Sequence, residues 1–361
     1  MMSSSSDLIQ SWRIRAARQV ADGLNDQRTA WGVMHGAEGF PNHVGRDLDL
    51  LVAPKSLESF SSLTAAILRS DGWDVSVVRL PWDVNQVIAS RTEKQSLTIA
   101  FEADFVARQV WCGVPLAIGP PRSEHLHQIA DRMWLDAWGG FVKGLLVQSL
   151  AGNWSKLADR REEWALGPFQ ESVVRERLAK LAGPGASNGY LEALRSGDES
   201  ALIAASHRLK RQLLIRHSLR PASVFRHGIR WAIHRRRQRG TTTPRAPLLL
   251  LAGCRDISNE ELRETLHREL GATLVFPGIR VMSLPAGGDS RKIRDIRHLS
   301  AIGVLVVLRI DGSDMNQAAI PWFPAEGVAR AYWSGAVDAG TALGGDLMAR
   351  FHALHRTEGD S

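Results

Sequence analysis

Two aspartates, two positions apart, are the residues of this chain best suited to hold a metal ion. Asp47 and Asp49 open the apolar run Asp47–Val52, whose pattern predicts a β-strand. Side chains at positions i and i+2 of a strand point to one face, so both carboxylates would project together. Two like charges held side by side need a cation or a proton to compensate them. Carboxylate oxygens suit Mg²⁺ or Mn²⁺, and the spacing therefore predicts a divalent-metal site.

A glycine-containing turn comes before the two aspartates. The short apolar run Trp31–Met34 predicts a strand, and the Gly-rich stretch His35–Gly45 follows it. Gly36 would let the backbone approach a triphosphate closely. His35 and His43 flank the turn and could contact phosphate, although histidines in such positions more often serve loop or core packing.

This order of features resembles the DNA polymerase beta-like nucleotidyltransferase superfamily. The later stretch Leu97–Leu116 resembles the matching stretch of the members found among bacterial surface-polysaccharide genes. The family signature is an apolar residue, Gly and a small residue, then a spacer and Asp-apolar-Asp at a strand end. Here His35-Gly36-Ala37 is followed by nine residues and Asp47-Leu48-Asp49. Ala37 stands where the family usually has Gly or Ser. The resemblance by motif covers about Trp31 to Leu116.

The resemblance implies a third acid on a later strand. Asp104 is the best candidate because it ends the strand-like run Leu97–Asp104, and Glu102, with the same strand parity, is the alternative. By the same resemblance, Asp47 and Asp49 would hold Mg²⁺ or Mn²⁺ on a nucleoside triphosphate. Asp104 would complete the metal site and help deprotonate the attacking hydroxyl. The nucleotide-binding residues implied are Gly36 and Ala37, through the backbone, and Arg46, as a charge partner.

The alternation of elements predicts an α/β (α+β) fold in three parts. Residues 1–120 would form a nucleotidyltransferase-type palm domain with a mixed sheet. Residues 121–239 carry a helical signal from Ser123 onward and would form a helical domain with a basic segment. A linker, 239–247, leads to a small α/β domain at 240–361, in which the last stretch, 325–354, also predicts a helix.

The last domain begins with the strand–loop–helix pattern of a P-loop but lacks its chemistry. Aligning Gly253 with the first glycine of G-x-x-x-x-G-K-[ST] places Ser258, Asn259 and Glu260 at the last three positions. The phosphate-binding lysine is absent. We interpret this segment as a degenerate P-loop of a kinase-like domain, with ordinary α/β packing as the open alternative.

The net charge of +7 comes from one segment. Between Ser200 and Arg255 there are thirteen Lys or Arg and no carboxylate, so the rest of the chain carries a net −6. Such a segment could bind an anionic membrane surface, nucleic acid or a polyphosphorylated substrate, or it could be a set of solvated helix faces. With two cysteines and no run of about 20 apolar residues, we expect a cytoplasmic protein, peripheral at the inner membrane face if the segment binds lipid.

Three functions remain open at this point. The first is an Mg²⁺-dependent nucleotidyltransferase that moves a nucleoside monophosphate from a nucleoside triphosphate (NTP) to a small or glycan-linked acceptor, in surface-polysaccharide biosynthesis. The second is a catalytically inactive binding or scaffold protein in envelope-glycan assembly. The third is an RNA-modifying nucleotidyltransferase, which the basic segment would serve.

Overall fold

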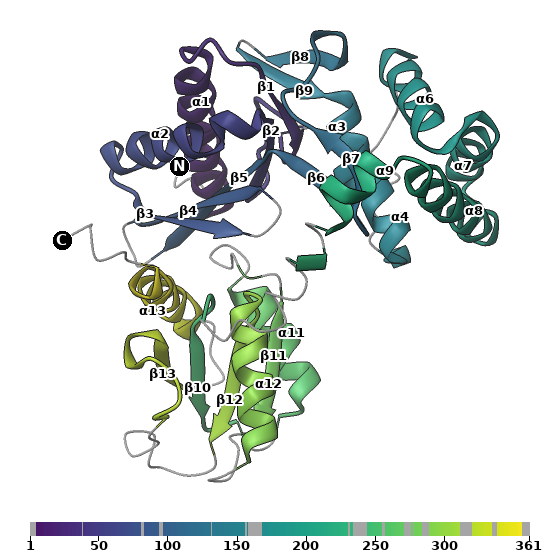
Figure 1. The fold of residues 1–361 in the computed structure, drawn as a ribbon. Helices are drawn as coiled ribbons and strands as arrows, with labels where there is room; N and C mark the ends of the chain where they lie inside the picture. The colour runs from purple at the N-terminus through teal and green to yellow at the C-terminus, as the bar shows by residue number, and fades with distance from the viewer. Residues whose placement is uncertain are drawn as a thin grey trace.

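The protein folds into a large sheet domain, a helical domain and a small parallel-sheet domain (Figure 1). The predicted α/β fold class is confirmed, with one mixed sheet and one parallel sheet. The computed structural model describes residues 5–37, 39–80, 83–93, 97–130, 132–155, 157, 168–229, 232–233, 244–254, 257–270, 276, 278–283, 289–310, 320–333 and 338–355.

Seven strands form the large sheet, in the order β3-β4-β5-β2-β1-β9-β8. Strand β2 is parallel to β5 and antiparallel to β1, so the sheet is mixed as predicted. The strands span Trp31–His35 (β1), Asp47–Val52 (β2), Asp74–Leu80 (β3), Val84–Thr92 (β4), Thr98–Val106 (β5), Leu126–Ala130 (β8) and Met133–Asp136 (β9). Between β5 and β8, Arg108–Trp111 (β6) and Val114–Ile118 (β7) form a separate hairpin.

Two helices cover one face of this sheet. Helices α1 (Ser5–Asn25) and α2 (Leu57–Ser70) share an apolar core with the side chains of β2 at Leu48, Leu50 and Val52. Because strand side chains alternate, the residues between them project from the opposite face. The covering helices therefore fix the direction in which the acidic side chains of β2 point.

The first part of the predicted helical region is not helical. The sequence predicts helix from Ser123 onward, but residues 126–130 and 133–136 form β8 and β9, and β9 pairs with β1. Pairing with the exposed edge of the sheet at β1 supplies the backbone hydrogen bonds that these short segments need. This pairing overrides their weak local preference for helix. The large sheet consequently continues past residue 120, where the sequence places the end of the first domain.

A helical domain follows. One continuous helix comprises α3 (Ala137–Phe141), the π-helical turn η4 (Val142–Leu146) and α4 (Val147–Ala151). Its partners are α6 (Pro168–Ala182), α7 (Pro184–Ser196) and α8 (Glu199–Ser218), which are followed by α9 (Pro221–Ser223) and a π-helical turn, η5 (Val224–Gly228). Their shared core includes Phe141 and Tyr190, and the Tyr190 hydroxyl lies 2.6 Å from Ser149 Oγ.

The last domain has four parallel strands in the order β11-β12-β10-β13. The predicted helix at 325–354 is wrong in its first part, because residues 328–332 form a strand whose backbone pairs with β10. Most of the predicted linker 239–247 lies outside the described residues. The elements are Leu248–Ala252 (β10), Asn259–Glu269 (α11), Ile279–Ser283 (β11), Ser290–Ala301 (α12), Leu305–Ile310 (β12), Ala325–Gly327 (η6), Val328–Tyr332 (β13) and Asp338–Leu354 (α13).

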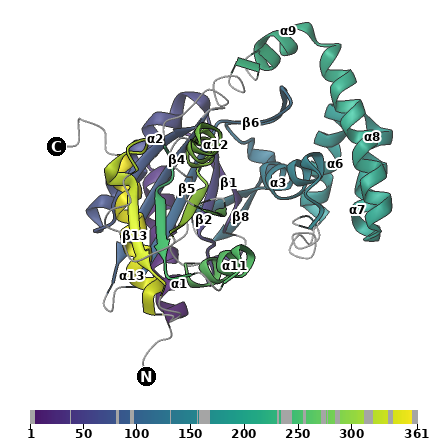
Figure 2. The same cartoon turned by 90° about the horizontal axis from the view of Figure 1, so that it is seen from below.

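This parallel-sheet domain packs on the acid-bearing face of the large sheet. His352 of α13 is buried, and hydrogen bonds join its two ring nitrogens to Ser76 Oγ at 2.7 Å and Ser90 Oγ at 2.9 Å. Ile88 and Ala100 belong to the apolar core of the last domain. The last domain thus covers one end of the face from which the acids project (Figures 1 and 2). Within the described ranges, no helix has both the length and the apolar character needed to cross a bilayer.

Candidate acidic metal site

The pairing of β2 with β5 brings the predicted acids together. In this parallel pair Asp47 lies opposite Glu102, and Asp49 lies opposite Asp104. All four carboxyl side chains share the strand parity that points away from α1 and α2. Asp49 is 1% exposed. The structure therefore places the three predicted acids, and the alternative one, side by side on one face of the sheet.

Three side chains present ligand atoms to a common point. Atoms of His35, Asp47 and Asp49 all lie within 4.8 Å of one another. His35 Nδ1 is 3.8 Å from Asp49 Oδ2, because His35 ends β1 directly opposite Asp49. Asp49 Oδ2 is buried and receives no hydrogen bond from the described residues. Two carboxylates and an imidazole fit Mn²⁺ well, and the carboxylate oxygens fit Mg²⁺.

A lysine supplies the positive charge at this site. Lys143 Nζ lies 2.8 Å from Asp49 Oδ1. Lys143 belongs to the π-helical turn η4, and such turns inside α-helices are frequent at functional sites. Burial disfavours the charged lysine, but Asp49 and Asp104 outweigh it and raise the pKa of Lys143. The ammonium group is therefore charged and compensates the buried aspartate.

The two acids of β5, Glu102 and Asp104, accept hydrogen bonds from one side-chain amide and have raised pKa values. Gln86 Nε2 on β4 donates to Glu102 Oε1 at 2.7 Å and to Asp104 Oδ1 at 2.9 Å. Burial and the charge of Asp104 raise the pKa of Glu102 well above its usual range, which favours its protonated form. Burial and Asp49 raise the pKa of Asp104 to about 6, against the opposing effects of Lys143 and Gln86. Asp104 lies beside Asp49 but is not one of the three residues whose ligand atoms converge. Its role as a metal ligand stays a prediction.

The turn residues of the signature are buried. Gly36 has φ +97°, and a Cβ there would lie 1.9 Å from the Asp47 carbonyl oxygen, so only glycine fits. Its own carbonyl accepts from Gly45 N at 2.8 Å. Ala37 has no exposed surface and packs in the core under α1. Packing against Asp47 explains Gly36 without a ligand, and contact of Gly36 and Ala37 with phosphate stays a prediction.

Arg46 lies beside the acids, as its position in the sequence requires. Its carbonyl oxygen accepts from Glu102 N at 2.9 Å, which ties the start of β2 to β5. Its charge acts on the neighbouring acid by opposing the rise in the pKa of Glu102. Burial and, second, the nearby charge of Arg46 lower the pKa of Arg13 on α1 to about 10. Both arginines thus sit within electrostatic reach of the acidic strands.

The degenerate P-loop segment after β10 forms hydrogen bonds with other residues of the protein. Ser258 caps α11 by accepting from Glu261 N at 3.1 Å. Arg309 donates to Asn259 Oδ1 at 2.9 Å and to the Cys254 carbonyl. Asn259 stands where a P-loop has its lysine, and here its side chain binds an arginine of β12.

Sequence reasoning missed Lys143, Gln86 and the ligand position of His35. One signal was available for the lysine: it is the only charged residue in the apolar stretch Ala137–Ala151. An isolated charge in a buried helix needs a partner of opposite charge. No signal identified Gln86, because a polar residue in a strand has many uses.

Comparisons of the chain with protein-family models, curated proteins and solved structures found no match.

Lys143→Met should destabilise the metal-free protein by about 3 kcal/mol, because removing one partner of a buried pair leaves Asp49 charged and uncompensated. Mn²⁺ should then raise the melting temperature of the variant more than that of the parent, since no ammonium competes for Asp49. Urea unfolding and thermal scans with and without Mn²⁺ measure the two effects.

Lys180→Met is the matched control, because Lys180 pairs with Glu176 on the exposed surface of α6. That variant should unfold like the parent. A Lys143→Met protein as stable as the Lys180→Met protein, with no added response to Mn²⁺, would show that Lys143 does not compensate the acids.

Proposed function

We propose that this protein is a divalent-metal-dependent nucleotidyltransferase that moves a nucleoside monophosphate from an NTP to a small or glycan-linked acceptor. The observation that supports it best is the convergence of Asp47, Asp49 and His35, with Asp104 in register beside Asp49. Four carboxyl groups with only partial internal compensation form a site that gains from a divalent cation and from its phosphate ligand.

The roles follow from the positions of the side chains. A bound divalent cation would neutralise triphosphate charge and orient the reacting phosphate. Asp47 and Asp49 would hold it, with His35 as a further ligand. Lys143 has a flexible stem, so its ammonium can leave Asp49 for a phosphate oxygen when Asp49 gains another cation. Asp104 would accept the proton of the attacking hydroxyl.

Two alternatives keep specific support. A catalytically inactive scaffold protein is favoured by Ala37 in the signature and by Asn259, which stands at the P-loop lysine position and binds Arg309. An RNA-modifying enzyme is favoured by the basic segment. The nucleotide test below separates the first alternative from the proposal, and the salt and lipid test separates the second.

A separate observation bears on where the protein works. Helix α8 buries Leu202, Leu209 and Leu213 against the helical domain, while large apolar side chains lie exposed at its end and beyond. We call the exposed set the apolar arm surface; it comprises Leu214, Ile215, Leu219, Phe225, Ile229 and Ile233. Leu219 and Phe225 are 75% and 74% exposed. Helix α8 lies at the outer edge of the protein in both views, and α9 does so in Figure 2 (Figures 1 and 2).

Basic residues share this surface. At 3.6 residues per turn, the exposed Arg208 and Arg211 fall in the same outward arc of α8 as Leu214 and Ile215. An outward helix face that mixes arginine with large apolar side chains matches an anionic lipid surface, which takes the charge at the headgroups and the apolar groups below them. We propose that the apolar arm surface attaches the protein to such a membrane.

Asp47→Asn and Asp49→Asn should each abolish stabilisation of the protein by Mg²⁺ and NTP together, while the fold survives, because each removes a charged ligand. Thermal scans with each of the common NTPs, with and without Mg²⁺, measure this. Asp26→Asn is the control, since Asp26 is an exposed partner of Arg132. If both site variants respond to Mg²⁺ and NTP as the parent does, the site is misassigned.

For the membrane proposal, the full-length protein should co-sediment with vesicles that contain anionic lipid, and binding should weaken as salt rises. The double variant Leu219→Ser, Phe225→Ser should bind at least about tenfold more weakly, because it removes the side chains that would be buried. Ile302→Ser, on an exposed site of the last domain, should leave binding unchanged. Salt-sensitive RNA binding that ignores the double variant, with no vesicle binding, would favour nucleic acid instead.

A further inference from the structure

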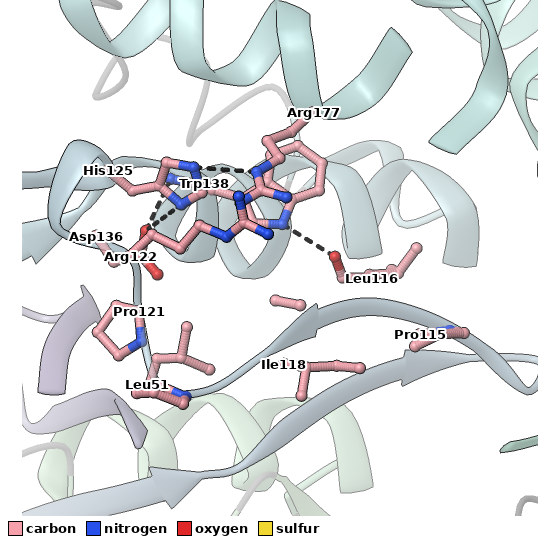
Figure 3. A pocket seen from close by; sticks show the side chains of 12 residues that line it. Leu51, Pro115, Leu116, Ile118, Pro121, Arg122, His125, Asp136, Trp138 and Arg177 are labelled. Atoms are coloured by element: carbon pink, nitrogen blue, oxygen red, sulfur yellow. Dashed lines mark hydrogen bonds and ion pairs between the residues drawn. The ribbon is translucent and has the colours of Figure 1, made fainter. Parts of the chain in front are cut away.

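A pocket outside the acidic group lies where the large sheet meets the helical domain (Figure 3). Its volume is about 240 Å³, which is below the roughly 300–1,000 Å³ of drug-sized ligand sites. Strand β2 contributes Leu51, the turn after β7 contributes Pro121 and Arg122, and α6 contributes Arg177. The pocket therefore suits a small molecule held by three parts of the chain.

One side of the pocket is apolar. Leu51, Ile118 and Pro121 lie together on that side in Figure 3, and the Trp138 ring lies on the other. Trp138 Nε1 donates to the Leu116 carbonyl at 2.9 Å, so its polar atom is engaged and its ring remains as apolar wall. A ring or short aliphatic body would fit between these surfaces.

The other side carries two guanidinium groups. Arg177 Nε donates to His125 Nε2 at 3.0 Å, which requires that nitrogen of His125 to be unprotonated. Burial and Arg177 lower the pKa of His125, in agreement with a neutral ring. Arg122 lies close to Arg177. Burial and, second, the charge of Arg122 lower the pKa of Arg177. Two like charges are thus held near each other at the pocket.

Two carboxylates lie near these guanidinium groups: Asp136, which also lines the pocket, and Glu124, which pairs with Arg122. Asp136 caps the helix that begins at α3 by accepting from Trp138 N, and its Oδ1 is 4.0 Å from His125 Nδ1. Glu124 pairs with Arg122 only at 3.5 Å, with both side chains more than half exposed. Among the described residues, no carboxylate lies within ion-pair distance of Arg177. An anion between Arg122 and Arg177 would relieve their repulsion.

Strand β2 and the helix that begins at α3 connect the pocket with the acidic face. Leu51 follows Asp49 by two positions on β2, so its side chain points to the same face about 7 Å further along the strand. Asp136 caps the same continuous helix that carries Lys143 to Asp49. A molecule in the pocket would therefore lie beside the place where a triphosphate would bind the acids.

We propose that this pocket binds a small molecule with one carboxylate or phosphate group and an apolar body, and that this molecule, through a hydroxyl group, is the acceptor of the transfer reaction. The hydroxyl oxygen would bond to the α-phosphorus of the NTP, pyrophosphate would leave, and the hydroxyl proton would pass to Asp104. The anion would lie between Arg122 and Arg177, and the body on Leu51, Pro121 and Trp138. The binding claim stands on the pocket alone, whereas the acceptor role rests on the proposed function.

The test uses three probes of one shape on the full-length protein, without Mg²⁺ or nucleotide: benzoate, phenyl phosphate and the uncharged benzyl alcohol. Calorimetry or ligand-observed NMR should show that at least one anion binds about tenfold more tightly than the alcohol. The stronger of the two anions identifies the group. Arg177→Gln and Arg122→Gln should each weaken anion binding severalfold, and Arg177→Gln more, because Arg122 is the more exposed.

Arg175→Gln is the matched control, since Arg175 lies on the same helix but binds Glu171 and Asn188. It should bind the anions as the parent does. Equal binding of all three probes, or an unchanged anion affinity in Arg177→Gln, would overturn the proposal that this pocket binds an anion.

The acceptor role has its own outcome. Mg²⁺ with a non-hydrolysable NTP analogue should leave the affinity for the anionic probe intact, because donor and acceptor must bind together. Mutual exclusion of probe and nucleotide would overturn the acceptor role. Failure of the Asp47→Asn and Asp49→Asn test with intact probe binding would instead overturn the transferase and leave the anion pocket standing.

Discussion

The parallel register of β2 and β5 is the constraint on which the rest of this structure depends. It sets Asp49 beside Asp104 and Asp47 beside Glu102, on a face that other elements then bury. Four carboxyl groups cannot all be charged there without compensation. The protein meets this requirement with the ammonium of Lys143, the amide of Gln86 and burial of Glu102, which raises the pKa of Glu102 and favours its protonated form. Each of these partners comes from a different element, so the site forms only when those elements are assembled.

The layers around the sheet explain why the acids lie where they do. Helices α1 and α2 fill one face with a continuous apolar core, which leaves the opposite face to the acids. The last domain covers one end of that face through α13 and His352, and the helix with Lys143 crosses nearer the acids. The acidic residues thus occupy a strip between two packed regions. The pocket that we propose for an anion begins further along the same strand, at Leu51.

Local sequence patterns predict the parts of this arrangement that depend on a single strand or helix. The spacing of Asp47 and Asp49 gives their shared face, and the α/β class follows from the alternation of elements. Partners from distant segments are a different matter. Lys143 and Gln86 meet the acids only through tertiary packing. Residues 126–130 and 133–136 become strands because an edge of the sheet is there to pair with. Gly36 illustrates the reverse case: its spacing suggests phosphate binding, while its φ and its contact with the Asp47 carbonyl show a backbone requirement.

The most direct measurement of the central claim is anomalous diffraction from crystals grown with Mn²⁺ and a non-hydrolysable NTP analogue. If Asp47 and Asp49 hold the metal on the nucleotide, an Mn²⁺ peak will lie between their carboxylates with the triphosphate beside it. The Lys143 ammonium will have moved away from Asp49. A nucleotide bound elsewhere, or a Lys143–Asp49 pair that persists with no Mn²⁺ at the acids, would contradict that claim.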